Sequence, residues 1–261
     1  TYTDRRFLVV VEPMIAPNET NARVYGGDSI VVLSPSHGNI PLDDVRHVYL
    51  HYSLEPLLYA RVGAMDRLLP LLKSVREAPL DVSYRSDIVA LVTESLIRAI
   101  EARTMTTGIA PYKMPTNVRR SEMDRIERER QTVNQQIDAV RRKSVDHSMQ
   151  LGFILTAYFY DALAAFEHDP VSLKEAIGDM VYDMDVSSQV GRAKQIAFLP
   201  EGATDVVKRA PRQTSVIDQA EVKLMKGDRA GAQQLAQHAL EQDTGDAAQA
   251  NFILARTALM S

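Results

Sequence analysis

The strongest constraint on the fold is a change in the apolar pattern of the chain near residue 41. Before this point, two runs rich in β-branched residues, 6–12 (RFLVVVE) and 28–34 (DSIVVLS), each end next to a proline and predict two buried strands. After it, apolar residues recur mostly with the 3.6-residue period of helices. The pattern predicts an α+β fold that is predominantly helical, with a small N-terminal sheet.

The helical part contains apolar and strongly charged segments. We expect helices over 61–77, within 82–103, over 152–167, and in short pieces over 171–198. The charged stretch at about 118–143 keeps only a narrow apolar seam, so we expect it to form an exposed helix or projecting hairpin inserted in the domain.

Two histidines, His47 and His51, stand four residues apart in a segment with helical periodicity. The helix is expected to begin near Asp43 and to end or kink at Pro56. Residues four apart lie on one helix face, so both imidazoles can direct a nitrogen at one metal ion. The apolar positions of this helix are expected to form a different stripe, so the pair need not be ordinary core filling.

The usual catalytic neighbour of such a pair is missing. In the pattern H-E-x-x-H, the Glu after the first histidine acts as the general base on a metal-bound water. That position is Val48 in this chain. The spacing therefore suggests a metal site and, at the same time, argues against efficient peptide cleavage.

The order of elements around the pair resembles the zincin metallopeptidases whose third ligand is a Glu on a separate helix. In this comparison 28–34 is the strand beside the active-site cleft, and 91–99 (LVTESLIRA) resembles the segment with the third ligand. The resemblance covers roughly residues 6–103 and departs at Val48. It implies a site for zinc formed by His47, His51 and Glu94, although a chain that has lost catalysis can also have lost the metal.

Two carboxylates are candidates for orienting the histidines. Metal-bound histidines commonly donate their other N–H to a carboxylate, so Asp43 is expected beside His47 and Glu55 beside His51. Glu55 lies two helical turns beyond His47, about 12 Å along the axis, and cannot replace the missing base. The alternative is ordinary hydrogen bonding of the histidines without any metal.

Composition excludes several classes of function. A net charge of −4 argues against a nucleic-acid binder, because phosphate neutralisation needs a concentrated basic surface. The absence of Cys excludes disulfides, Cys-ligated zinc and thiol catalysis. No apolar run is long enough for a membrane span. The first residue is Thr, which fits a trimmed chain or an exported protein after signal removal, and we favour export to the periplasm or the extracellular space.

The C-terminal region changes in composition. Residues 199–215 contain Pro200, Gly202 and Pro211 and predict a linker. Residues 216–261, rich in Ala, Gln and Leu, resemble a tetratricopeptide repeat, with small residues where paired helices cross and a Gly227-Asp228 turn between them. The resemblance covers about one and a third repeats and departs at Thr244, where the pattern usually has Pro.

The sequence thus predicts a zincin-like domain over 1–198, a linker over 199–215 and tetratricopeptide-like helices over 216–261. The preferred function is that of a pseudoenzyme that binds a protein or peptide, either along the cleft edge strand or as a subunit of a larger assembly. The first alternative is an active zinc peptidase using His47, His51 and Glu94. The second is a structural protein whose histidines never meet a metal, in which Glu94 would point away from both imidazoles.

Overall fold

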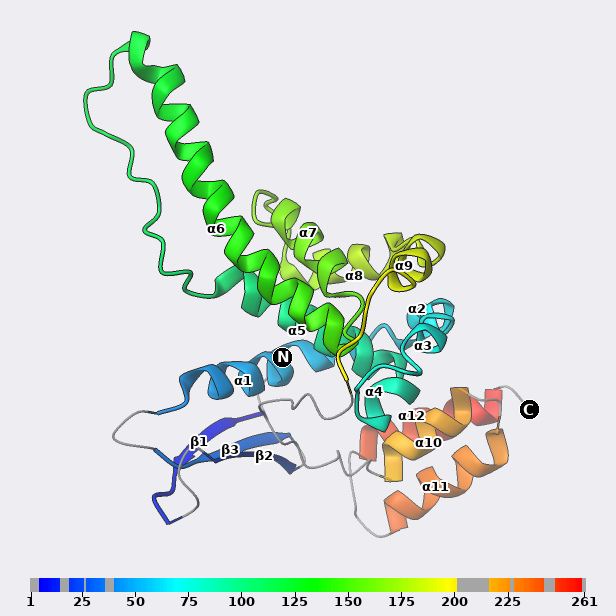
Figure 1. The fold of residues 1–261 in the computed structure, drawn as a ribbon. Helices are drawn as coiled ribbons and strands as arrows, with labels where there is room; N and C mark the ends of the chain where they lie inside the picture. The colour runs from blue at the N-terminus through cyan, green and yellow to red at the C-terminus, as the bar shows by residue number, and fades with distance from the viewer. Residues whose placement is uncertain are drawn as a thin grey trace. The chain divides into compact units, whose positions relative to one another are not determined.

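The computed structural model describes residues 5–14, 19–25, 27–35, 40–200, 216–225, 228–241 and 247–259. The chain divides into two compact units, one formed by Thr1–Pro41 with Val207–Ser261 and the other by Leu42–Val206. Within the described residues, one small sheet accompanies many helices (Figure 1). This confirms the predicted α+β class with a predominance of helix.

The sheet consists of β1 (Phe7–Val11), β2 (Thr20–Tyr25) and β3 (Asp28–Leu33) in the order β1-β3-β2. β1 is parallel to β3, and β2 is antiparallel to it. The two predicted strands are β1 and β3, but the expectation that the first is buried is wrong, because Leu8, Val9, Val10 and Val11 of β1 are 40 to 50% exposed. β2 escaped prediction because its residues, TNARVY, contain no run of β-branched residues. Since β3 is paired on both sides, the expectation that 28–34 provides an edge for a bound peptide is wrong.

The histidine helix is α1 (Leu42–Tyr59), which continues through Pro56 instead of ending there. The expected helix over 61–77 is broken into α2 (Val62–Met65), η1 (Asp66–Leu68) and α3 (Leu71–Ser74). Pro70 separates the last two, because proline has no N–H with which to continue a helical ladder.

The expected helix within 82–103 is divided into α4 (Val82–Ser86) and α5 (Ile88–Thr104). Asp87 lies between them in an extended conformation, and its carboxylate accepts hydrogen bonds from the backbone N–H groups of Val89 and Ala90. This cap sets the start of α5.

A short 3-10 turn, η2 (Arg120–Glu122), leads into α6 (Met123–Leu151). α6 ends at Gly152, whose φ of 112° is left-handed, and a Cβ there would lie 2.6 Å from the Ala78 Cβ. The apolar helix expected over 152–167 therefore starts later, as α7 (Thr156–Phe166). It is followed by α8 (Leu173–Asp183) and α9 (Val186–Ala193).

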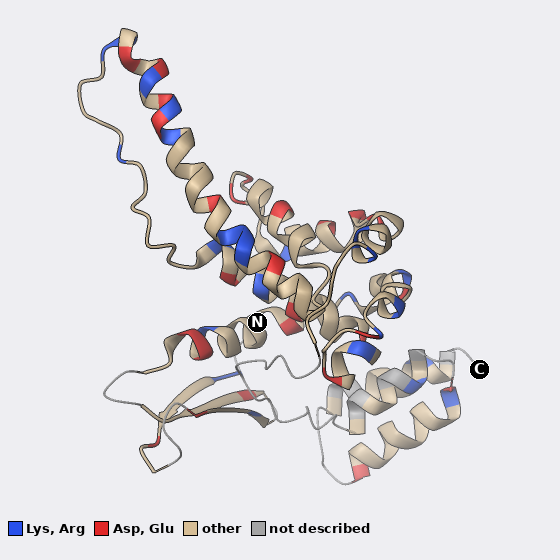
Figure 2. Cartoon of the chain, viewed as in Figure 1, with Lys and Arg blue, Asp and Glu red and all other residues tan. Residues whose placement is uncertain are grey.

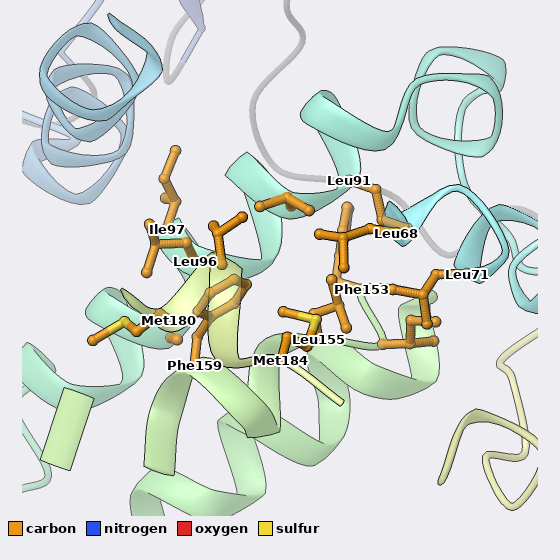
Figure 3. Close-up of a cluster of buried hydrophobic side chains, with 14 of the residues drawn as sticks. Leu68, Leu71, Leu91, Leu96, Ile97, Phe153, Leu155, Phe159, Met180 and Met184 are labelled. Atoms are coloured by element: carbon orange, nitrogen blue, oxygen red, sulfur yellow. The ribbon is translucent and has the colours of Figure 1, made fainter. Parts of the chain in front are cut away.

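The main hydrophobic core gathers around α5 (Figure 3). Residues on several sides of this helix, including Leu91, Val92, Leu96 and Ile97, have no exposed surface. The other large core side chains come from the α6 to α7 connection, from α7, from α8 and the residue that follows it, and from the short helices before α5; they include Leu68, Leu71, Phe153, Leu155, Phe159, Met180 and Met184. Any charged group on the inner faces of α5 is consequently removed from water.

The outer part of α6 extends away from the other helices of its unit (Figure 1) and carries charges of both signs (Figure 2). Its charges pair along the helix: the closest nitrogen and oxygen atoms are 2.7 Å apart in Arg125 and Glu129 and 2.9 Å apart in Arg130 and Glu127. The projecting helix expected over 118–143 corresponds to this part of α6. Such exposed pairs stabilise the helix locally by a few tenths of a kcal/mol each.

The base of this arm is fixed by Tyr160 of α7, a side chain that is only 1% exposed. Its hydroxyl donates to Oδ1 of Asp138 on α6 at 2.6 Å. The guanidinium groups of Arg103 and Arg142 lie 4.9 and 5.2 Å from the centre of its ring. Burial and the bond to Asp138 raise the pKa of Tyr160 to about 12. The cluster joins α5, α6 and α7.

The C-terminal helices are α10 (Val216–Met225), α11 (Arg229–Glu241) and α12 (Ala247–Leu259). Asp228 accepts a hydrogen bond from the backbone N–H of Gly231 at the start of α11. Their own small core consists mainly of alanines, namely Ala220, Ala232, Ala236, Ala239 and Ala250, with Ile253. Small side chains at these positions let helices pack closely. Positions 201–215 of the expected linker, Gly227 and Thr244 lie outside the described residues.

Among the helices that the structure describes, none combines the length and the apolar composition required to cross a membrane.

Tyr160→Phe is expected to lower the free energy of unfolding by about 1 kcal/mol at pH 7, because it removes a buried hydrogen bond. The raised pKa favours the neutral phenol in the folded state. The stabilisation that the neutral Tyr160 phenol gives to the folded state is therefore complete below pH 10 and is lost as the pH rises towards about 12. Urea unfolding of parent and variant should show a difference that narrows above pH 10.

Tyr182→Phe is the matched control, since Tyr182 is 62% exposed, and it should change stability little. A parent-to-Tyr160→Phe difference that stays constant up to pH 12 would contradict the role given to the phenol.

Candidate metal centre

The three residues predicted to hold a metal lie together in the structure. His47 and His51 project from α1, and Glu94 projects from α5, the helix against which α1 packs. Their side chains are 13%, 5% and 0% exposed. One ligand atom from each lies within 4.8 Å of the other two.

α1 presents both histidines because of the face that it buries. Val48, His51, Leu54 and Leu58 are buried at helical spacing, whereas Tyr49 is 50% exposed. His51 therefore belongs to the packed face, which corrects the expectation that the histidines lie on a stripe separate from the packed residues. His47 lies one turn earlier, at the margin of this face.

A single carboxylate faces both imidazoles. The distance from His51 Nε2 to Glu94 Oε2 is 2.9 Å, and that from His47 Nε2 to Glu94 Oε1 is 3.6 Å. The two ring centres are 4.9 Å apart. If the histidines served only a structural role, Glu94 was expected to point away from them. The structure shows the opposite, because its carboxylate faces both imidazoles.

The other nitrogen of each imidazole contacts a second carboxylate. His51 Nδ1 lies 3.0 Å from Glu55 Oε1, the neighbour predicted for it. His47 Nδ1 lies 2.9 Å from Glu101 Oε1. The predicted neighbour of His47, Asp43, occupies the exposed first turn of α1, with a side chain that is 90% exposed and 3.1 Å from Arg46.

Glu101 escaped prediction because its relation to His47 is not local. It follows Glu94 by seven residues, which places both on one face of α5 two turns apart. The contact between Glu101 and His47 can be predicted only when it is known that α1 packs along that face of α5.

These contacts determine what the centre can accept. A carboxylate beside each Nδ1 favours a proton on that nitrogen, so the Nε2 of each neutral imidazole turns a lone pair towards Glu94. Two lone pairs and a carboxylate then converge. Within the described part of the chain, the buried Glu94 Oε1 has no hydrogen-bond donor. A set of acceptors of this kind requires a cation, which can be protons or a metal ion.

The spacing of the acceptors fits a small divalent metal. Zinc bonds of about 2.0 to 2.1 Å in tetrahedral geometry place ligand atoms about 3.3 Å apart. The two distances from Glu94 to the Nε2 atoms, 2.9 and 3.6 Å, lie on either side of this value. These distances run to different oxygens of Glu94, and one ligand atom from each residue lies within 4.8 Å of the other two, so the side chains would have to move closer together to enclose an ion.

One protein cation already contacts the centre. Arg98 Nε lies 2.9 Å from Glu94 Oε1, one helical turn further along α5. This is an ion-pair distance without the alignment of a hydrogen bond. The Arg98 guanidinium also lies 4.1 Å from the centre of the Phe153 ring. Arg98 thus provides a positive charge beside Glu94 without any metal ion.

No protein-family model, curated protein or solved structure matches this chain. The chemistry of the centre is therefore inferred from its own residues.

Proposed function

We propose that this chain is a zincin-like, zinc-binding protein that has lost efficient peptide hydrolysis and serves to bind a protein or peptide. The observation that carries the proposal is the convergence of His47 Nε2, His51 Nε2 and the Glu94 carboxylate in a buried cluster. Their order along the chain is the one that the zincin resemblance implies.

Zinc is the metal that best suits this set of donors. Two imidazoles and one carboxylate are a ligand combination common for zinc, whereas calcium and magnesium prefer oxygen ligands alone. The carboxylates of Glu55 and Glu101 hold the imidazoles from behind, an arrangement typical of metal-bound histidines.

Two observations favour binding over hydrolysis. The position of the general base is Val48, an aliphatic side chain only 3% exposed that cannot accept a proton. The three ligand side chains are at least 87% buried, whereas catalytic zinc keeps an open coordination position for water or substrate. Bound zinc would acidify a water molecule, but loss of acid-base help typically costs 10²- to 10⁴-fold in rate.

The sheet supports a role in binding an extended segment. β1 lies at one edge of the sheet, and its residues Leu8, Val9, Val10 and Val11 are 40 to 50% exposed. An apolar edge strand is a template on which another strand can pair through its backbone. The C-terminal helices, with their alanine-lined packing, support a second contact surface of the tetratricopeptide type.

Protein purified without chelators or a metal-binding tag is expected to contain about one zinc per chain, as measured by elemental analysis. His47→Ala/His51→Ala should remove it, because both imidazole ligands are lost. His147→Ala/His168→Ala is the matched control, since both of these histidines are exposed and outside the cluster. Absence of zinc from the parent, even after reconstitution, would overturn the proposal.

Glu101→Ala is expected to weaken zinc binding by about 10- to 100-fold, because it releases the His47 ring from its hydrogen bond to the Glu101 carboxylate. Asp43→Ala should leave zinc affinity unchanged, because that carboxylate pairs with Arg46 at the surface. Titration against a competing chelator measures both. The opposite ranking would restore Asp43 as the residue that orients His47.

Zinc-loaded parent protein is expected to hydrolyse unfolded protein or peptide libraries no faster than His47→Ala/His51→Ala. The buried valine at position 48 is the reason. The assay follows newly formed amino groups with and without a zinc chelator. Chelator-sensitive cleavage that disappears in the double variant would favour the active peptidase instead.

A further inference from the structure

Arg98 is held in place at the centre of the helical unit. Its side chain is 13% exposed, its Nε lies 2.9 Å from Glu94 Oε1, and its guanidinium stacks 4.1 Å from the centre of the Phe153 ring. Phe153 is itself 1% exposed, so the ring is a fixed surface. The guanidinium is thus confined between the carboxylate and an aromatic face, both of which attract a cation.

The carboxylate that it contacts has no access to water, since Glu94 is 0% exposed. A buried, ionised carboxylate is costly unless an opposite charge accompanies it. Arginine stays protonated in proteins, so Arg98 supplies that charge under all ordinary conditions. The cluster can therefore fold without a metal ion.

The same contact works against a metal ion. Arg98 lies beside Oε1, and Glu94 is the only carboxylate of the three-residue ligand set found in the described residues. An ion held by this set would share the carboxylate with the guanidinium and be repelled by its positive charge. Since the site is buried, solvent and salt screen this repulsion only weakly.

We propose that Arg98 is a resident counter-ion that competes with the metal for Glu94: it stabilises the metal-free fold and lowers metal affinity, making the metal exchangeable. The identity of the metal as zinc rests on the function proposed above. The opposing hypothesis is that Arg98 positions Glu94 as a ligand. The two hypotheses predict opposite changes in affinity when the arginine is removed.

Arg98→Met keeps an apolar chain against Phe153 and removes the charge. We expect it to bind zinc at least about tenfold more tightly than the parent, in titrations against a competing chelator. Its metal-free form should unfold at a lower temperature than that of the parent, and zinc should raise its unfolding temperature by more. Arg98→Lys, which keeps the charge, should retain the weaker affinity of the parent.

Arg103→Met is the matched control. Arg103 is on the same helix and also lies over an aromatic ring, that of Tyr160, but it pairs with Glu167 outside the cluster. Its removal should leave zinc affinity within about twofold of the parent, because the charge is distant from the ligands. Arg98→Gln provides the same comparison with the parent if Arg98→Met does not fold.

The outcomes separate the two proposals. If the parent binds zinc and Arg98→Met binds it with equal or lower affinity, the role proposed for Arg98 is overturned and zinc binding by the protein stands. Zinc bound by Arg98→Met but not by the parent would support that role and overturn zinc binding by the parent. No zinc in either protein would overturn both.

Discussion

The central constraint on the helical unit is the complete burial of a carboxyl group, that of Glu94, in the middle of its most enclosed helix. Such a group is tolerated only when its surroundings supply positive charge or hydrogen-bond donors. His47, His51 and Arg98 all converge on it. The packing of α1 on α5 is therefore tied to polar chemistry as well as to apolar contact, and the two helices have a defined register at this point.

The contacts that the sequence predicted directly are those between residues close together in the chain. His51 and Glu55 are four residues apart on one helix, so their contact follows from helical geometry alone. Glu94 was found through the order of elements that the zincin resemblance implies. Glu101 and Arg98 gain their meaning only from the packing of α1 and Phe153 against α5, which no spacing within one segment indicates.

The same distinction applies to the fold. The β-branched runs predicted β1 and β3, and apolar periodicity predicted the main helices. β2 mixes polar and apolar residues and has no such run, and the helix boundaries depended on single residues. Asp87 starts α5 by capping its first turn, and Gly152 ends α6 through its left-handed backbone. Such residues outweigh periodicity because each changes the hydrogen bonding of a whole helix end.

The arm formed by α6 has a mechanical property that follows from its anchor. The part of α6 from Asp138 to its first residue, Met123, is about 23 Å long, so a rotation of about 5° at its base moves its tip by about 2 Å. Its base is joined through Asp138 and Tyr160 to Arg103, which belongs to α5. A force applied at the tip would therefore act on the contact between Asp138 and Tyr160, which Arg103 connects to the helix that carries Glu94.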